Sequence, residues 1–338
     1  MYMRSLFRIT FFVLSCCWSI VAFSQDPIYS QFYMSPTVLN PAFAGNNKGA
    51  FLAVNYRNQW PGVNQAYSTF SLAYDQGYGD NSGLGIYINN DSAGAGAVKT
   101  TKVGGIYSYK VRLRDKTYLK GAIEAGYGQT SLDWDQLVFF DSLDPQFGAT
   151  SPGGVTIPTA EIPRSNLAQG FFDIGSGLMI YNPLWYAGIS YKHMNSPNID
   201  FVGDQTGSTG QLPSRITVHG GLQIPLEGGN IDQNTPFLSP NMLISRQADF
   251  WQVTAGAYMD ISQMFGGLWY RQGGINGDAV IASVGVKSGL FKIAYSFDYT
   301  VSKLGIGSGG SHEIGVSMLF DKLQPKYFPY SDCLNMFR

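Results

Sequence analysis

Charged residues are scarce in this sequence. Asp, Glu, Lys and Arg make up 13% of its 338 residues, whereas soluble domains carry about a quarter. The 22 Lys and Arg and the 23 Asp and Glu give a net charge of −1. Without Arg4 and Arg8, which lie in a segment that we expect to be removed, 20 basic residues remain against 23 acidic ones, and the net charge becomes −3. This balance excludes the basic surface that nucleic-acid binding requires, so we expect no nucleic-acid partner.

Long hydrophobic runs are missing after the first 25 residues. The one long run, residues 9–21, follows Arg4 and Arg8 and precedes the small-x-small sequence Ala22-Phe23-Ser24. These three parts predict a cleaved secretory signal over residues 1–24. A retained membrane helix is the competing interpretation, but the run is short and no basic stop-transfer cluster follows it. Because no second run of 18 or more apolar residues exists, helices do not span a membrane in the mature chain.

Cysteine is nearly absent as well. Cys16 and Cys17 lie within the predicted signal, which leaves Cys333 alone in the mature chain. A lone cysteine excludes an internal disulfide framework. The simplest interpretation is a loosely held thiol in a carboxy-terminal tail.

Catalytic and metal-binding sets are also lacking. His193, His219 and His312 are far apart in sequence and show no ligand spacing. The glycine-rich run 305–310 leads into a strand pattern rather than into the helix that a phosphate site needs. The acidic run 133–144 lacks the residue order of a calcium loop. We therefore expect no enzyme activity, no cofactor and no metal.

The sequence is instead rich in glycine and aromatic residues, with 41 Gly, 21 Tyr and 22 Phe, and its dominant pattern has a period of two. In residues 102–114, apolar Val103, Tyr107 and Val111 alternate with polar or small residues. Strict alternation predicts half-buried strands. We predict fourteen of them, at 50–59, 66–75, 83–91, 100–114, 117–130, 170–181, 184–194, 213–224, 237–247, 249–259, 265–272, 278–287, 290–300 and 311–320.

Two all-β architectures fit so many alternating strands, a soluble sandwich and a closed transmembrane antiparallel β-barrel. A sandwich needs a charged exterior, but the polar face here consists mainly of Gly, Ser, Ala and Thr. A barrel places the apolar face toward lipid and the small polar face toward the lumen, and closure leaves no strand edge. The barrel is favoured, and an even strand count places both chain ends in the periplasm. Aromatic residues near strand ends suit interfacial girdles: Tyr74, Trp185, Tyr191, Trp269, Tyr270 and Tyr299.

Several charges fall on the predicted lumen face. These candidate lumen charges are Lys102, Lys110, Arg112, Arg114, Lys120 and Glu124. They could form a selectivity ring in a conducting pore. Alternatively, they could pair with acidic residues such as Asp173 or Asp298 and fill the lumen, and this second interpretation is favoured.

The segment 26–45, DPIYSQFYMSPTVLNPAFAG, follows the signal and has no regular period. Its prolines remove ladder donors and so deny it a place in the barrel wall. Its four aromatic residues and Met34 need burial, and Asp26 is its single charge. We predict that it packs inside the barrel or across its periplasmic mouth, where it plugs the lumen or presents a docking surface.

This segment resembles the amino-terminal signature of the PorP/SprF family of type IX secretion system membrane proteins from Bacteroidetes. The matching residues are Pro27, Tyr29, Ser30, Gln31, Phe32, Pro36, Leu39, Asn40, Pro41, Ala42 and Gly45. Further along, NYRNQWPG resembles a first-strand element of the family, through Tyr56, Arg57, Gln59 and Trp60. Near the end, SHEIGVSMLF resembles its closing strand, through His312, Glu313 and Ile314.

The resemblance implies a barrel in the outer membrane, in contact with its lipid, that performs no catalysis. It implies a role in the secretion or surface anchoring of an adhesin that carries a type IX C-terminal sorting domain, as in gliding motility. It also implies periplasmic partners, namely the type IX ring or peptidoglycan-linked components.

The expected organisation has four parts: the signal 1–24, a periplasmic plug segment 25–49, the barrel 50–320 and a periplasmic tail 321–338. An outer-membrane diffusion porin with a basic lumen is the alternative function. An outer-membrane lipase would need a Ser/His/acid set that the sequence does not offer.

Overall fold

The computed structural model describes residues 26–47, 49–63, 66–144, 146, 148, 155, 157–162, 167–201, 210–227, 235–274, 276–302, 305–320 and 333–338. The predicted signal 1–24 and residues 321–332 of the predicted tail lie outside this part of the chain. No helix within it is long and apolar enough to cross a membrane.

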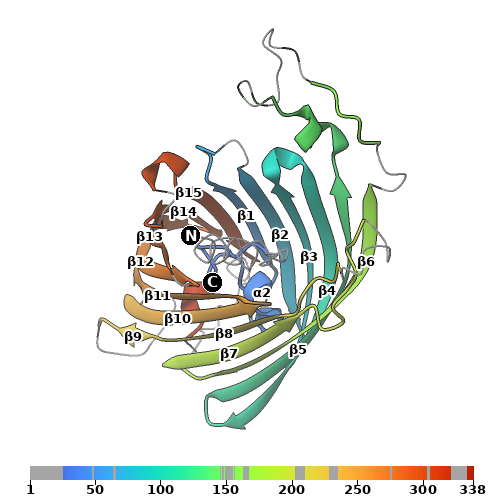
Figure 1. Cartoon of the computed structure of the whole chain (residues 1–338). Helices are drawn as coiled ribbons and strands as arrows, with labels where there is room; N and C mark the ends of the chain where they lie inside the picture. The colour runs from blue at the N-terminus through green and yellow to red at the C-terminus, as the bar shows by residue number, and fades with distance from the viewer. Residues whose placement is uncertain are drawn as a thin grey trace, which may run out of the picture.

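Antiparallel strands form one continuous sheet (Figure 1). They are β1 (Phe51–Gln59), β2 (Tyr67–Tyr78), β3 (Ser82–Ala93), β4 (Val98–Arg114), β5 (Thr117–Leu132), β6 (Ala168–Tyr181), β7 (Trp185–Lys192), β8 (Arg215–Leu222), β9 (Ile224–Pro225), β10 (Phe237–Gln247), β11 (Phe250–Ile261), β12 (Met264–Gly273), β13 (Asn276–Ser288), β14 (Phe291–Thr300) and β15 (Ser311–Leu319). Each predicted strand is confirmed, with bounds that differ by a few residues.

The sheet closes on itself. Sequence neighbours pair around the ring, β1 pairs with β15, and β10 pairs with β11, β8 and the short β9. Because β9 continues β8 after Gln223, we count these two strands as a single strand of the barrel wall, and we call each such complete strand a stave. The described residues therefore make a closed barrel of fourteen staves. The predicted transmembrane β-barrel is thus confirmed.

Short helices occur before the first strand, in the joins between strands and after the last strand. They are α2 (Pro36–Leu39) and the 3-10 helices η1 (Pro41–Phe43), η2 (Gly94–Gly96), η3 (Trp134–Gln136), η4 (Phe140–Ser142), η6 (Ile306–Ser308) and η8 (Asn335–Phe337). We call the barrel end with the tight joins 79–81, 115–116, 182–184, 262–263 and 289–290 the turn side. The opposite end, with the long joins 133–167 and 193–214, is the loop side.

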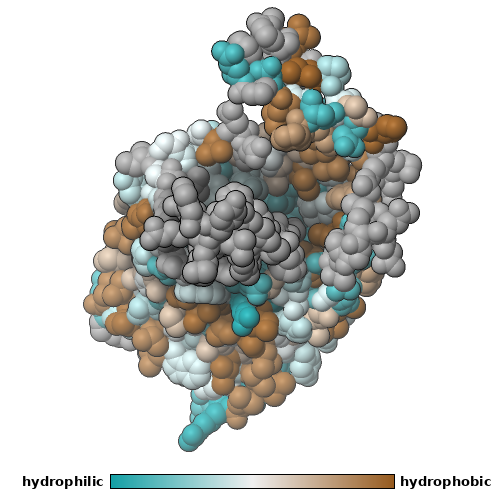
Figure 2. All heavy atoms as spheres, in the orientation of Figure 1, coloured by the Kyte–Doolittle hydropathy of each residue, from teal (hydrophilic) through white to brown (hydrophobic). Residues whose placement is uncertain are grey.

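Alternating side chains face outward and inward, as the period of two predicts. On β4, Val103 and Tyr107 are 51% and 45% exposed on the outer wall, while Ser108 of the same strand faces the lumen and is fully buried. Figure 2 shows hydrophobic residues spread over the outer wall. Trp269 departs from the predicted girdle, since it faces inward and is buried, whereas its neighbour Tyr270 is exposed.

Candidate functional site

Residues 26–47 lie inside the ring of strands (Figure 1). Tyr33, Met34 and Ala42 are at most 1% exposed. The local shape follows from the prolines: Pro36 occupies the first turn of α2, where its missing N–H costs no hydrogen bond. Asn40 then caps η1, because its Oδ1 accepts a 2.9 Å hydrogen bond from the Ala42 N–H. We call these residues the inner segment.

At its loop-side end, the inner segment is held by an ionic cluster around Asp26. The Asp26 carboxylate contacts His193 Nε2 and lies 3.2 Å from Lys102 Nζ and 3.6 Å from Arg215 Nη1. His193 Nδ1 is in turn 2.8 Å from Asp173 Oδ1. Burial would raise the pKa of Asp26, but His193, Lys102 and Arg215 outweigh it and hold this pKa well below its usual value. Burial would lower the pKa of His193, but Asp26 and Asp173 raise it instead.

Further along the inner segment, Glu313 of β15 binds its backbone. Its two oxygens accept the N–H groups of Ser30 at 2.8 Å and Gln31 at 3.0 Å. Arg57 of β1 bridges Glu313 at 3.1 Å and Asp298 of β14 at 2.8 Å. The side chains of these three charged residues are at most 2% exposed, so each charge is compensated within the interior.

Aromatic side chains of the inner segment pack against rings from the wall. Tyr33 stacks on Trp269 with ring centroids 5.7 Å apart, and it also contacts Tyr258 at 5.2 Å. Phe32 meets Trp269 edge to face at 6.1 Å. Inward-facing aromatic residues of β11 and β12 therefore form a socket for this part of the segment.

On the opposite wall, Asn40 bridges β6, β7 and β8. Its Nδ2 lies within hydrogen-bond distance of Leu178 O at 3.3 Å, Ile189 O at 3.2 Å and His219 Nε2 at 2.9 Å. Gly177 makes this approach possible, because a Cβ there would come within 3.0 Å of the Pro41 ring and would overlap Asn40. His219, which the sequence left without a role, is thus a partner of the signature residue Asn40.

At the turn side, the inner segment is fixed by contacts to its main chain. The Ala44 carbonyl accepts from Lys120 Nζ at 2.5 Å and from Ser108 Oγ at 2.7 Å. The Gly45 N–H donates to Asp75 Oδ1 at 2.7 Å. The inner segment therefore runs from the loop-side half of the lumen to the turn side, with polar anchors along its length.

Residues 333–338 also enter the barrel at the turn side. Phe337 packs on Phe43 with centroids 4.4 Å apart, and Met336 O accepts from Lys292 Nζ at 2.6 Å. Cys333 is 2% exposed and its N–H bonds to Asn182 O. The expectation of a loosely held tail thiol is therefore wrong, because hydrophobic packing draws this end into the lumen.

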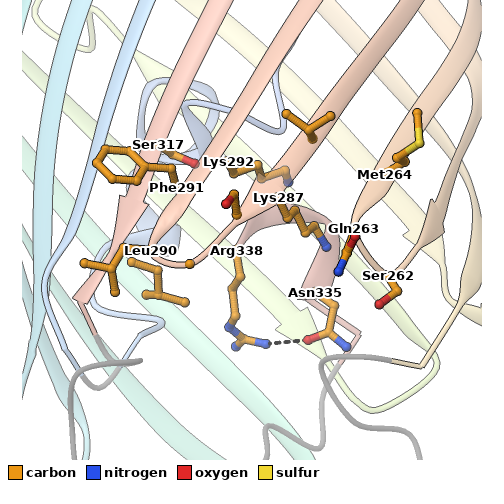
Figure 3. A pocket seen from close by; sticks show the side chains of 14 residues that line it. Ser262, Gln263, Met264, Lys287, Leu290, Phe291, Lys292, Ser317, Asn335 and Arg338 are labelled. Carbon is orange, nitrogen blue, oxygen red and sulfur yellow. Dashed lines mark hydrogen bonds between the residues drawn. The ribbon is translucent and has the colours of Figure 1, made fainter.

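A pocket of about 600 Å³ lies between residues 333–338 and the turn-side ends of β12, β13 and β14. Figure 3 shows Lys287, Lys292 and Arg338 along its walls, with Arg338 bonded to Asn335 at 3.3 Å. Each of the three has a partner within the chain, since Lys287 pairs with Asp260, Lys292 donates to Met336 O and Arg338 donates to Asn47 and Asn335. We call this cavity the turn-side pocket.

The candidate lumen charges divide into two groups. Lys102, Lys120 and Glu124 face the lumen, and Glu124 lies 3.5 Å from Lys192. The others lie toward the turn-side tip of the β4–β5 hairpin, where Lys110 sits over the Tyr118 ring, Arg112 is 61% exposed and paired with Asp115, and Arg114 is exposed. Arg112 and Arg114 are thus wrongly placed by the alternation, because β4 extends past its pairing with β3 at Ser82 and bulges between these two arginines.

The motif residues of β1 and β15 also alternate. Tyr56 and Ile314 are exposed on the outer wall, whereas Arg57 and Glu313 point inward. His312 lies on the outer wall, 2.7 Å from the Tyr295 hydroxyl. Gln59 and Trp60 lie at the loop-side mouth. Arg271 was not singled out by the sequence analysis, yet from the interior it donates to Asp298 and to the Ser30 hydroxyl. Only its inward parity on a strand could have pointed to it.

The described residues contain no group of three His, Cys, Asp or Glu side chains that could hold a metal ion. Their buried charges are arranged to bind a polypeptide segment, with carboxylates on N–H groups and cations on carbonyls. The chemistry of this interior is that of a binding surface.

The model of the type IX secretion system membrane protein PorP/SprF family matches residues 21–318. The chain belongs to this family. The PorP/SprF match and the closed barrel make it an outer-membrane protein of the type IX secretion system. No curated protein sequence matches the chain.

Several solved barrels are similar to this PorP/SprF chain, with low sequence identity and low TM-scores. A FadL homologue from Pseudomonas aeruginosa has 12% identity and a TM-score of 0.42, over 83% of this chain and 94% of that one. A mutant of the TodX monoaromatic hydrocarbon channel has 9% identity and a TM-score of 0.44, over 84% and 92%. The chain spans 46% of the length of a ferric enterobactin receptor from Pseudomonas aeruginosa, at 12% identity and a TM-score of 0.32.

Proposed function

We propose that this barrel supports the secretion or surface anchoring of an adhesin that carries a type IX C-terminal sorting domain. Membership of the PorP/SprF family supports a secretion role. In this proposal the apolar outer wall contacts outer-membrane lipid, the turn side faces the periplasm and the loop side faces the cell surface, as short turns and long loops do in other outer-membrane barrels.

The observation that carries the proposal is the filled lumen. The inner segment is anchored to the wall from Asp26 to Gly45, so it occupies the space through which solutes would pass. Two cavities beside it measure about 80 and 30 Å³, room for only a few water molecules at about 30 Å³ each. Because the charges of the lumen bind the protein's own chain, the barrel is better suited to anchoring or docking a partner than to the diffusion of solutes through a pore.

The turn-side pocket is the place where this proposal puts a periplasmic partner. A carboxylate of the type IX ring or of a peptidoglycan-linked component would meet Lys287, Lys292 and Arg338 there beside their present partners, such as Asp260 on Lys287. Contacts of this kind are charge-assisted hydrogen bonds, which are shorter and stronger than neutral ones.

Gene deletion tests whether secretion or surface anchoring of an adhesin, which we call the client, depends on this barrel. Loss of the barrel should abolish surface display of an adhesin that carries a type IX C-terminal sorting domain, while secretion of type IX enzymes continues. Cell-surface labelling of the adhesin and assays of secreted enzyme activity measure both, and complementation by the intact gene is the control. Unchanged adhesin display would refute the proposal.

Conductance separates this function from that of a porin. The purified barrel in a planar bilayer should give no stable conductance, whereas a variant without residues 26–45 should open a channel. A stable ohmic conductance of the intact barrel would favour the porin instead.

A further inference from the structure

A second cavity of the described part of the barrel lies on the loop side. It measures about 520 Å³, lies above residues 26–28 of the inner segment and reaches the ends of strands from β11 round to β4. Its volume falls within the range of about 300–1,000 Å³ that small-ligand sites show. Trp60, Tyr67 and Phe250 contribute aromatic rings to its wall, and Gln59, Asp91 and Asp278 contribute polar groups. We call this cavity the vestibule.

Trp60 stands out at its rim. Its backbone has a φ of 57°, a left-handed conformation that is a true outlier for a bulky residue. The structure enforces it, because the Trp60 N–H donates to Gly310 O at 2.8 Å and the Gly62 N–H to Ser308 O at 3.0 Å. Strain of this kind concentrates at functional sites. This backbone conformation holds the Trp60 indole edge to face with the Tyr67 ring, with ring centroids 5.9 Å apart.

Some oxygen atoms in the vestibule accept no hydrogen bond from the described residues. Asp91 uses Oδ1 to accept from Thr69 at 2.7 Å, and Asp278 uses Oδ2 for Arg271. The second oxygen of each carboxylate has no hydrogen-bond donor among the described residues. Ser302 Oγ is buried there and likewise has no partner within this part of the chain.

The two arginines around the vestibule are compensated internally. Arg57 and Arg271 are paired with Asp298, and they also bind Glu313 and Asp278 respectively. An anion therefore finds no uncompensated cation, and a cation finds only the half-used carboxylates of Asp91 and Asp278. What the cavity offers is aromatic faces beside hydrogen-bond acceptors and the Gln59 amide.

We propose that the vestibule binds a neutral oligosaccharide. The hydroxyl groups of a sugar donate to carboxylate oxygens such as those of Asp91 and Asp278, and its apolar C–H faces pack on rings such as Trp60 and Tyr67. An acyl chain would displace water from these acceptors without replacing its hydrogen bonds. Since the loop side faces the cell surface in the proposed orientation, the sugar would be part of a surface glycan.

Saturation-transfer NMR on the purified full-length barrel tests this inference. The probes are maltotriose, cellotriose and chitotriose, and the detergent must carry no sugar headgroup, because a maltoside would compete. At least one trisaccharide should receive saturation. Trp60→Ala and Asp91→Asn should each weaken that binding at least tenfold, while Trp60→Phe retains part of it.

Trp251→Ala is the matched control, since Trp251 lies on the outer wall and is 41% exposed. It should bind the sugar as the parent does. Heat-modifiable migration on gels confirms that each variant remains a folded barrel. Absence of transfer to all three sugars, or equal binding by folded Trp60→Ala, would overturn the proposal, as would tighter binding of trilysine than of any sugar. Adhesin display is a separate readout, so the two proposals can fail independently.

Discussion

Replacement of Glu313 by alanine probes how the wall holds the inner segment. The Glu313 side chain is fully buried, and its carboxylate accepts the N–H groups of Ser30 and Gln31 and a hydrogen bond from Arg57. No other acceptor for the two N–H groups occurs among the described contacts. The alanine variant therefore leaves two buried donors unsatisfied and removes one of the two carboxylates that neutralise Arg57.

Removal of one partner from a buried ion pair costs about 3–5 kcal/mol, and each unsatisfied N–H about 1–3 kcal/mol. These terms share atoms and do not add. Asp298 still neutralises Arg57 at 2.8 Å, so we expect a loss near the lower bound, about 3 kcal/mol in the free energy of unfolding. Glu313→Gln keeps one acceptor and should lose less.

Urea unfolding in detergent micelles, followed by tryptophan fluorescence, measures this loss. Asp115→Ala is the matched control, because the Arg112–Asp115 pair has side chains 61% and 94% exposed, and such pairs contribute little. It should unfold as the parent does. A Glu313→Ala variant that stays within about 1 kcal/mol of the parent, an ordinary mutational effect, would refute the view that this carboxylate anchors the segment.

Other perturbations test further anchors. Asp26, with its lowered pKa, contributes stability that is lost as the pH falls below about 4, and His193, with its raised pKa, contributes stability that is lost as the pH rises beyond about 6.5. Protection of residues 26–45 from hydrogen exchange, relative to the intrinsic rate at each pH, should therefore be greatest between these limits, with a flatter alkaline side in His193→Gln. Gly83→Ala would place a Cβ 2.8 Å from the Cα of Gly45 and should cost about 1–3 kcal/mol, whereas Gly105→Ala on the outer wall should unfold as the parent does. Lys292→Met should raise protease sensitivity at residues 333–338, since Met336 O loses its donor.

The barrel was predictable because alternation is a local property of the sequence. Each stave carries its own inward and outward residues, so fourteen strands could be placed without knowledge of their partners. The same logic failed where tertiary context takes over. The alternation that places Lys102 in the lumen extends to Arg112 without any signal that β4 has passed its pairing with β3. Trp269 has the same inward parity as Phe265 and Arg271, so the alternation itself points it into the lumen, and the expectation of a girdle residue there overlooked this parity.

The partners of the inner segment lay beyond sequence reasoning for the same reason. Asp26 meets His193, which is 167 residues away, and Ser30 meets Glu313, which is 283 residues away. Composition showed only that the segment needs burial and cannot join the wall. Which charges receive it depends on the register of staves that close the ring, and no local pattern reports that register.

The contacts that anchor the inner segment are distributed around the barrel, and this distribution limits how the barrel could act. The inner segment is bound through Asp26, Ser30, Asn40 and Ala44 to staves on different sides of the ring, and residues 333–338 pack against its turn-side end. Its release would require several buried polar clusters to break together, each leaving uncompensated charges or donors. Passage of a client through this lumen is therefore energetically unfavourable. Both proposals accordingly place the partners at the two mouths, in the turn-side pocket and in the vestibule, and residues 26–28 of the inner segment line the vestibule.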